Sequence, residues 1–209
     1  MNCPHPKPRV AFQGERGAFS EDAAIKLLGP DIELVPRRTF VALFNSLAEG
    51  AADYALAPIE NSLIGSIQPA VELLRESSLA IAGDVVIQIQ QNLIGCRGAL
   101  FEEIQVVESH PAALAQCERF FAAHPGIVRV ESEDTAGSVA RIVALGDLKR
   151  AAIAGRRAAE LYGGSILRED LQDRPENYTR FLLLQTASGA RVGLNTPTNP
   201  ELHVLDGFI

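Results

Sequence analysis

The sequence predicts an α/β fold made of two similarly built lobes. Short apolar or β-branched segments alternate with helical patterns over most of the 209 residues, as expected for strands and helices packed in layers. Two stretches also follow one plan: a helix opened by Thr39 leads to a strand at 54–57, and a helix opened by Thr135 leads to a strand at 151–154. We therefore expect each lobe to repeat the arrangement of the other.

The predicted strands are short runs of apolar residues, and the predicted helices show apolar residues at helical spacing. Helices are expected at 39–49 and 111–122. Two long extended stretches, 79–93 and 171–184, are expected to be the crossover between the lobes and the return. The strands are expected at 10–12, 32–35, 54–57, 104–107, 127–130 and 151–154.

These elements divide the chain into regions. We expect one lobe to contain about 9–86 and 177–185 and the other about 87–176, with a cleft between them. The proline-rich start, 1–8, is expected to be a disordered tail. Residues 186–209, with several Gly and Pro, are expected to be a loose extension.

The composition excludes several classes of protein. A formal net charge of -7 and a pI near 5.1 argue against binding to nucleic acid or an anionic membrane, because such binding uses clustered Lys and Arg. No segment approaches the roughly 18 consecutive apolar residues of a membrane span, and the start lacks a secretion signal. We therefore expect a cytoplasmic protein with a small-molecule partner and no nucleic-acid or membrane partner.

The three cysteines do not predict a disulfide or a metal site. Cys3, Cys96 and Cys117 are odd in number and lack paired ligand spacing. Buried or incidental thiols are the simpler interpretation. Cys3 and His5 could bind a metal adventitiously, but they lie in the predicted tail.

Three predicted strands run into segments rich in Ser, Thr, Asn and Gly, at 14–20, 58–65 and 133–137. We expect a helix to begin at each of these segments, with free backbone N–H groups that can hold carboxylates, at the strand ends where α/β sheets bind ligands. Singly, Ser20 or Thr135 would be an ordinary helix cap. The glycines at 14–20 fit neither a dinucleotide fingerprint nor a P-loop, so nucleotide binding is not expected.

A second polar segment, 172–181, enters an apolar strand. Arg180 could pair with a substrate carboxylate, and Thr179 could donate a hydrogen bond to a departing hydroxyl. The alternative is a strand-edge threonine beside a solvated arginine. His110 is a candidate general acid or base, or else part of a helix-capping turn before Pro111.

Taken together, these stretches resemble the prephenate dehydratase family. The shared motifs occur in the family's order from about residue 9 to residue 184. They are Gly14–Ser20 (Gly-x-x-Gly-x-Phe-Ser), Pro58–Gly65 (Pro-Ile-Glu-Asn-Ser-x-x-Gly), Ser109–Pro111 (Ser-His-Pro), Asp134–Ala136 (Asp-Thr-Ala) and Thr179–Phe181 (Thr-Arg-Phe).

The resemblance implies a fold like that of type II periplasmic binding proteins, with the active site between two lobes, and a homo-oligomer, dimer or tetramer. It implies conversion of prephenate to phenylpyruvate with no metal or organic cofactor. By this similarity Thr179 is the catalytic residue. The implied substrate-binding residues are Ser20, Asn61, Ser62, Thr135, Ala136, Arg180 and Phe181, with Glu60 and His110 as possible support.

The chain also departs from the family pattern. Gln90 and Gln91 stand where many relatives place a His, and Asp84 where they place a Glu. Relatives commonly continue into an ACT regulatory domain, whereas only about 25 residues follow Leu184 here, too few for such a domain.

Two other functions stay open. An arogenate dehydratase would act on the amino analogue of prephenate, and Glu60 or Asp134 could accept from its ammonium. A module that only binds a small anion would also suit a cleft built on helix N-termini.

Overall fold

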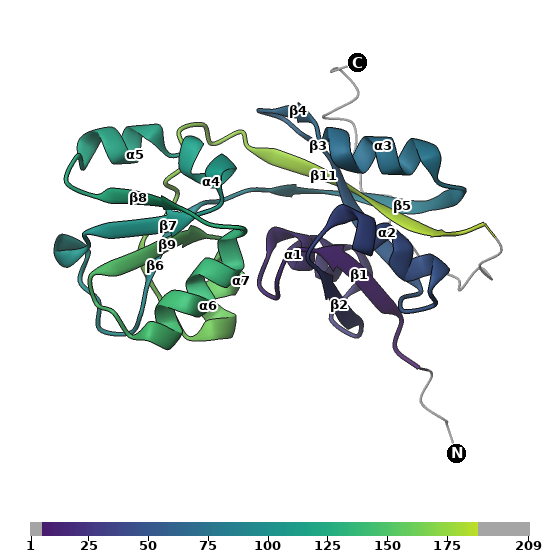
Figure 1. Ribbon diagram of the computed structural model, residues 1–209, viewed down its shortest axis with the longest axis horizontal. Coiled ribbons are helices and arrows are strands. Elements are labelled where there is room, and N and C mark those ends of the chain that lie inside the picture. Colours follow the sequence, from purple (N-terminus) through teal and green to yellow (C-terminus); the bar gives the residue numbers. More distant parts are fainter. Residues whose placement is uncertain (1–5, 188–209) are drawn as a thin grey trace. The chain divides into compact units, whose positions relative to one another are not determined.

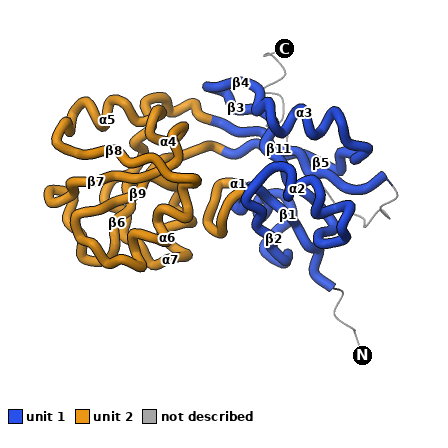
Figure 2. Tube along the Cα trace, in the orientation of Figure 1, with its two compact units in different colours: residues 1–13, 20–87, 178–209 blue, residues 14–19, 88–177 orange. Residues whose placement is uncertain are grey.

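The computed structural model describes residues 6–187, which form two compact units (Figure 2). Of these residues, 6–13, 20–87 and 178–187 belong to unit 1, and 14–19 and 88–177 to unit 2. The predicted tail as far as His5, with Cys3, and the predicted extension from residue 188 onward lie outside the described residues.

Unit 1 contains one mixed sheet with the strand order β2-β1-β3-β11-β5, and β4 pairs with β3 (Figure 1). The first three of these strands are parallel, and β11 runs antiparallel to β3. The elements are β1 (Arg9–Gln13), α1 (Phe19–Leu28), β2 (Glu33–Arg37), α2 (Phe40–Ala48), β3 (Tyr54–Asn61), β4 (Gly65–Ser66), α3 (Gln68–Glu76), β5 (Leu79–Gln88) and β11 (Tyr178–Thr186).

Unit 2 contains a second mixed sheet with the strand order β10-β6-β9-β7-β8. Strands β8, β7 and β9 are parallel, and β6 runs antiparallel to β9. The elements are β6 (Asn92–Gly95), a 3-10 turn (Phe101–Glu103), β7 (Val106–Ser109), α4 (Pro111–Ala115), α5 (Glu118–Ala123), β8 (Val128–Glu131), α6 (Thr135–Leu145), β9 (Arg150–Ala154), α7 (Arg156–Tyr162) and β10 (Ser165–Arg168).

The two sheets share one strand order. In each, three parallel strands are followed by an antiparallel strand, β11 or β6, and then by an outer strand, β5 or β10. Helix α2 precedes β3 as helix α6 precedes β9. The predicted α/β class and the predicted likeness of the two halves are both confirmed.

The core of unit 1 follows from alternation along the strands. Ala55 and Ala57 of β3 and Leu182 and Leu184 of β11 pack against the apolar face of α2. The intervening residue Leu56 is fully buried as well. The sheet is therefore covered on both faces, which explains why its central strands are apolar without interruption.

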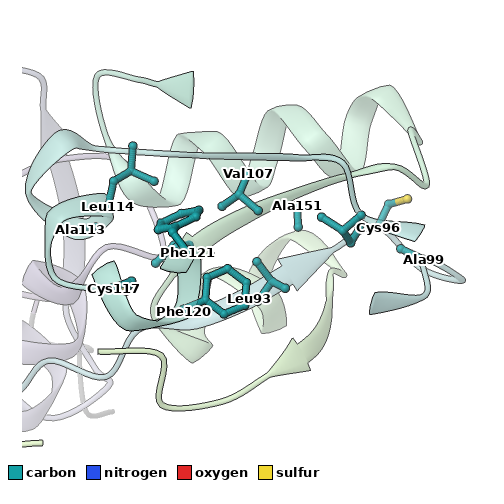
Figure 3. Packing of buried hydrophobic residues seen from close by; sticks show 12 residues of the cluster. Leu93, Cys96, Ala99, Val107, Ala113, Leu114, Cys117, Phe120, Phe121 and Ala151 are labelled. Atoms are coloured by element: carbon teal, nitrogen blue, oxygen red, sulfur yellow. The ribbon is translucent and has the colours of Figure 1, made fainter. Parts of the chain in front are cut away.

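Unit 2 has a core on each face of its sheet. Leu93, Val107 and Ile153 pack with α4 and α5 and with Phe120 and Phe121 (Figure 3), whereas the alternate strand residues pack with α6 and α7. Free Cys96 and Cys117 are both buried, as expected for structural thiols. Burial raises the pKa of the Cys117 thiol to about 12, so this group is a poor nucleophile.

The predicted helix at 111–122 is wrong in one respect, because the chain forms two short helices there. Gln116 ends α4, and its carbonyl oxygen accepts a hydrogen bond from the backbone N–H of Asp173. The Asp173 carboxylate then accepts from the backbone N–H groups of Glu118 and Arg119 at the start of α5. The return segment thus stabilises a helix start inside the predicted helix.

Residues 14–19 also differ from the predicted division, because they pack within unit 2. Gly17, at φ +84°, leaves no room for a Cβ, which would lie 2.9 Å from the Cα of Ala158. The hydroxyl of Tyr162 donates to the carbonyl oxygen of Arg16. The Phe19 ring lies so close to Gly155 that a Cβ there would be 2.9 Å from it.

Within residues 6–187, no helix is both long and apolar enough to cross a membrane.

Candidate functional site

The Thr-Arg-Phe strand lies beside the end of the Pro-Ile-Glu-Asn-Ser segment. In the antiparallel pairing of β11 with β3, Thr179 is opposite Asn61 and Phe181 is opposite Pro58, so the register skips Ile59. Proline has no N–H to donate to the ladder, and such residues are accommodated at bulges. We therefore correct the prediction for 58–65: the strand continues to Asn61, and no helix begins there.

Asn61 holds the hydroxyl of Thr179. Its Nδ2 donates to Thr179 Oγ1 and to the carbonyl oxygen of Tyr178, both at 3.0 Å. Its Oδ1 accepts from the backbone N–H groups of Leu63 and Ile64, so the amide orientation is set from both ends. Asn61 and Thr179 are only 5% and 7% exposed, which strengthens these hydrogen bonds relative to water.

Ser62 fixes the neighbouring peptide. Its backbone N–H donates to the carbonyl oxygen of Tyr178, and its Oγ accepts from the backbone N–H of Tyr178, both at 2.9 Å. Asn61, Ser62 and Thr179 therefore form one connected cluster in unit 1, here named the threonine half-site. Ser62 thus holds both the backbone N–H and the carbonyl group of Tyr178, the residue before Thr179.

The contacts of Thr179 define what its hydroxyl can do. The oxygen accepts from Asn61, so the hydroxyl hydrogen remains available for donation. Among residues 6–187, none accepts this hydrogen. The threonine half-site is thus arranged as a hydrogen-bond donor.

The three other predicted residues of these strands have structural contacts. Arg180 Nε donates to the Asp84 carboxylate on β5 at 2.9 Å, so its charge is already paired within the sheet. Phe181 is 3% exposed and belongs to the buried residues of unit 1. Glu60 lies opposite Arg180 in the register and is partly exposed.

Ser20 is buried in the first turn of α1. Glu21 and Asp22 follow it in the same turn, and these carboxylates already interact favourably with the positive end of the helix. Two carboxylates thus already lie in the first turn of this helix.

Helix α6 begins in unit 2 with two backbone N–H groups available. The cap is Asp134, not Thr135 as predicted, because the Asp134 side chain accepts from the backbone N–H of Gly137. No described residue accepts from the backbone N–H of Thr135 or Ala136. Thr135 and Ala136 form the helix half-site, which offers two donors and a helix dipole to an anion.

His110 caps a short helix. It precedes α4, and its Nδ1 accepts from the backbone N–H of Ala112 at 3.2 Å. The capping alternative stated for this residue is therefore what the geometry shows. The hydroxyl of the preceding Ser109 donates to the carbonyl oxygen of Ile153 and is also structural.

An amide cluster was missed from sequence. Gln116 Oε1 accepts from Gln91 Nε2 and from Asn177 Nδ2, and Gln91 Oε1 is buried without a hydrogen-bond partner in the described part of the chain. The only signal available was the position of Asn177, two residues before Thr179. The cluster anchors the return segment just before the strand that carries Thr179.

Comparisons with known proteins agree with these motifs. The family model "Prephenate dehydratase" matches residues 10–189. "Arogenate dehydratase 2" of Petunia hybrida is 44% identical over 177 residues, which are 84% of this chain and 44% of that protein. The chain thus spans less than half the length of this relative.

Two solved structures share the fold. "GqqA- a novel type of quorum quenching acylases" has a TM-score of 0.77 and 31% identity, and the match covers 87% of this chain and 65% of that one. The prephenate dehydratase of Arthrobacter aurescens, in complex with L-Phe, has a TM-score of 0.77 and 28% identity, with 85% and 60% covered.

Gly17 tests whether the packing of 14–19 contributes to stability. We expect Gly17→Ala to lower the free energy of unfolding, because the added Cβ meets the Ala158 backbone. Gly29→Ala is the matched control: φ is +81° and nothing lies within 4 Å of its Cβ position. Both variants lose about 1–2 kcal/mol to backbone strain.

The measurement is urea unfolding of each variant. The free energy of unfolding should fall further for Gly17→Ala than for Gly29→Ala. Equal losses in the two variants would show that the contact with Ala158 contributes nothing.

The motifs, their contacts and the matched family model lead to one assignment: this chain belongs to the prephenate dehydratase family.

Proposed function

We propose that the chain carries prephenate dehydratase activity, converting prephenate to phenylpyruvate, carbon dioxide and water. The observation that supports this most is the hydrogen bond from Asn61 to Thr179, which leaves the Thr179 hydroxyl as a donor. The name of the matched family supports the same reaction.

The chemistry requires little beyond orientation and help for the leaving group. As the ring carboxylate leaves as carbon dioxide, the electrons of its C–C bond enter the ring and expel the hydroxyl from the opposite carbon. Thr179 donates a hydrogen bond to that oxygen as it leaves as hydroxide, and the hydroxide takes up a proton from solvent to become water. A preorganised donor of this kind contributes about 3 kcal/mol in comparable sites.

Two carboxylates must be held while this happens. The helix half-site offers the backbone N–H groups of Thr135 and Ala136, and we assign it one carboxylate of prephenate. Holding a carboxylate in one orientation lowers the entropic part of the barrier. Catalysis needs no metal or organic cofactor in this scheme.

Acyl hydrolysis is less well supported, although the name of one similar structure gives that activity for that protein. A threonine nucleophile needs a base that accepts its proton, whereas Asn61 donates to Thr179. A cytoplasmic location and assembly as a dimer or tetramer also belong to the proposal, on the family resemblance.

Thr179→Ala should reduce kcat for phenylpyruvate formation by about 10²–10³, the loss seen when one preorganised donor is removed. Thr179→Ser keeps the hydroxyl and should retain much more activity. Binding of prephenate to Thr179→Ala should persist, measured by calorimetric titration. Retained turnover in Thr179→Ala would remove this residue from the mechanism, and absence of turnover in the parent would favour a module that only binds.

Prephenate should be turned over faster than arogenate by one purified sample, with kcat/KM measured for both. The two substrates differ in a keto oxygen and an ammonium group. The reverse order would identify an arogenate dehydratase, as the name of the petunia relative gives for that protein.

A further inference from the structure

A pair of hydroxyls lies beneath the start of α6. Ser132 Oγ and Ser138 Oγ are 2.6 Å apart. Both also reach the carbonyl oxygen of Asp134, at 3.0 Å and 2.8 Å respectively. Ser138 is fully buried, so its contacts are not shared with bulk solvent.

The two hydroxyl hydrogens have few acceptors. Either Ser138 donates to the Asp134 carbonyl while Ser132 donates to Ser138, or Ser132 donates to the carbonyl while Ser138 donates to Ser132. In both arrangements at least one hydroxyl donates to the Asp134 carbonyl oxygen. This contact is therefore built into the geometry.

A charged group completes the chain of hydrogen bonds. Arg141 NH2 donates to Ser138 Oγ at 3.1 Å and to Glu108 at 2.8 Å. Glu108 is 6% exposed and also pairs with Arg150. The chain of hydrogen bonds beneath α6 therefore ends on the Arg141 guanidinium, which Glu108 holds in place.

The Asp134 carbonyl belongs to the same peptide group as the backbone N–H of Thr135. Donation to a carbonyl oxygen polarises the peptide and makes its N–H a stronger donor. That N–H is one of the two that no described residue accepts from. The hydrogen bonds thus run from Arg141 through Ser138 and the Asp134 peptide to the helix half-site.

We propose that Ser138, supported by Arg141 and assisted by Ser132, is a positioning residue that strengthens the Thr135 N–H for a substrate carboxylate. This inference rests on the proposed function, because it takes the carboxylate to be that of prephenate. Ser138 does not touch the substrate and acts only through the Asp134 peptide.

The test measures prephenate binding by calorimetric titration in the Thr179→Ala background, where turnover does not interfere. Ser132→Ala should change Kd by less than about twofold, since Ser138, which accepts from Arg141, still donates to the carbonyl. Ser138→Ala should weaken binding more. The double variant Ser132→Ala/Ser138→Ala should weaken it about tenfold, which corresponds to the net value of about one hydrogen bond.

The same variants with Thr179 intact should show a raised KM and a kcat within about twofold of the parent, as expected when binding to ground and transition states weakens equally. Ser138→Thr keeps a hydroxyl and should restore KM. The matched control is Ser46→Ala in α2. Ser46 is also fully buried, accepts from Arg37 and donates to the Ala42 carbonyl, and its loss should leave KM unchanged.

Thermal unfolding is measured for every variant, because loss of a buried serine contact also affects stability. An unchanged Kd in the folded double variant would overturn the proposal. If the double variant does not fold, equal Kd values for the two single variants would overturn it. A parent that neither binds nor converts prephenate would instead contradict the proposed function, and this inference would fall with it.

Discussion

The hydrogen bond from the Asn61 amide to the Thr179 hydroxyl is the interaction on which the rest of the site depends. A threonine hydroxyl can donate or accept, and its partner decides which role it takes. The partner here is an amide whose oxygen is occupied by the turn at Leu63 and Ile64, so only its NH2 group faces Thr179. A strand register with a bulge beside Pro58 brings these two residues opposite each other. The strand pairing thus leaves the Thr179 hydroxyl to act as a hydrogen-bond donor.

The two units carry different kinds of hydrogen-bond donor. Unit 1 supplies a side-chain donor held between two strands, the threonine half-site. Unit 2 supplies backbone donors at the start of α6, the helix half-site, with a hydrogen-bond chain from Arg141 behind it. Both α2 and α6 precede the third parallel strand of their sheets. The two units therefore share one arrangement of elements but present different hydrogen-bond donors. The matched family model extends over both units.

Much of the fold could be predicted from sequence because alternation and helical spacing report burial directly. The strands at 54–57 and 151–154 and the helix opened by Thr39 are examples. The break at Gln116 could not be predicted, since its cause is Asp173, more than fifty residues away. The pairing of Arg180 with Asp84 on a neighbouring strand could not be predicted either, because the two residues are far apart in sequence. Motifs identified Thr179 and Asn61, but only the structure shows which of them donates.

The substitution Asn61→Asp tests the central claim most directly, because it replaces a donor with an isosteric acceptor. A carboxylate at this position accepts a hydrogen bond from the Thr179 hydroxyl, keeps its contacts with the turn and no longer donates to the Tyr178 carbonyl. We predict that kcat for prephenate falls by about 10²–10³ at neutral pH and partly recovers as the pH falls and the carboxyl group is protonated, with the fold verified by circular dichroism. A folded variant with parental kcat at neutral pH would contradict the account.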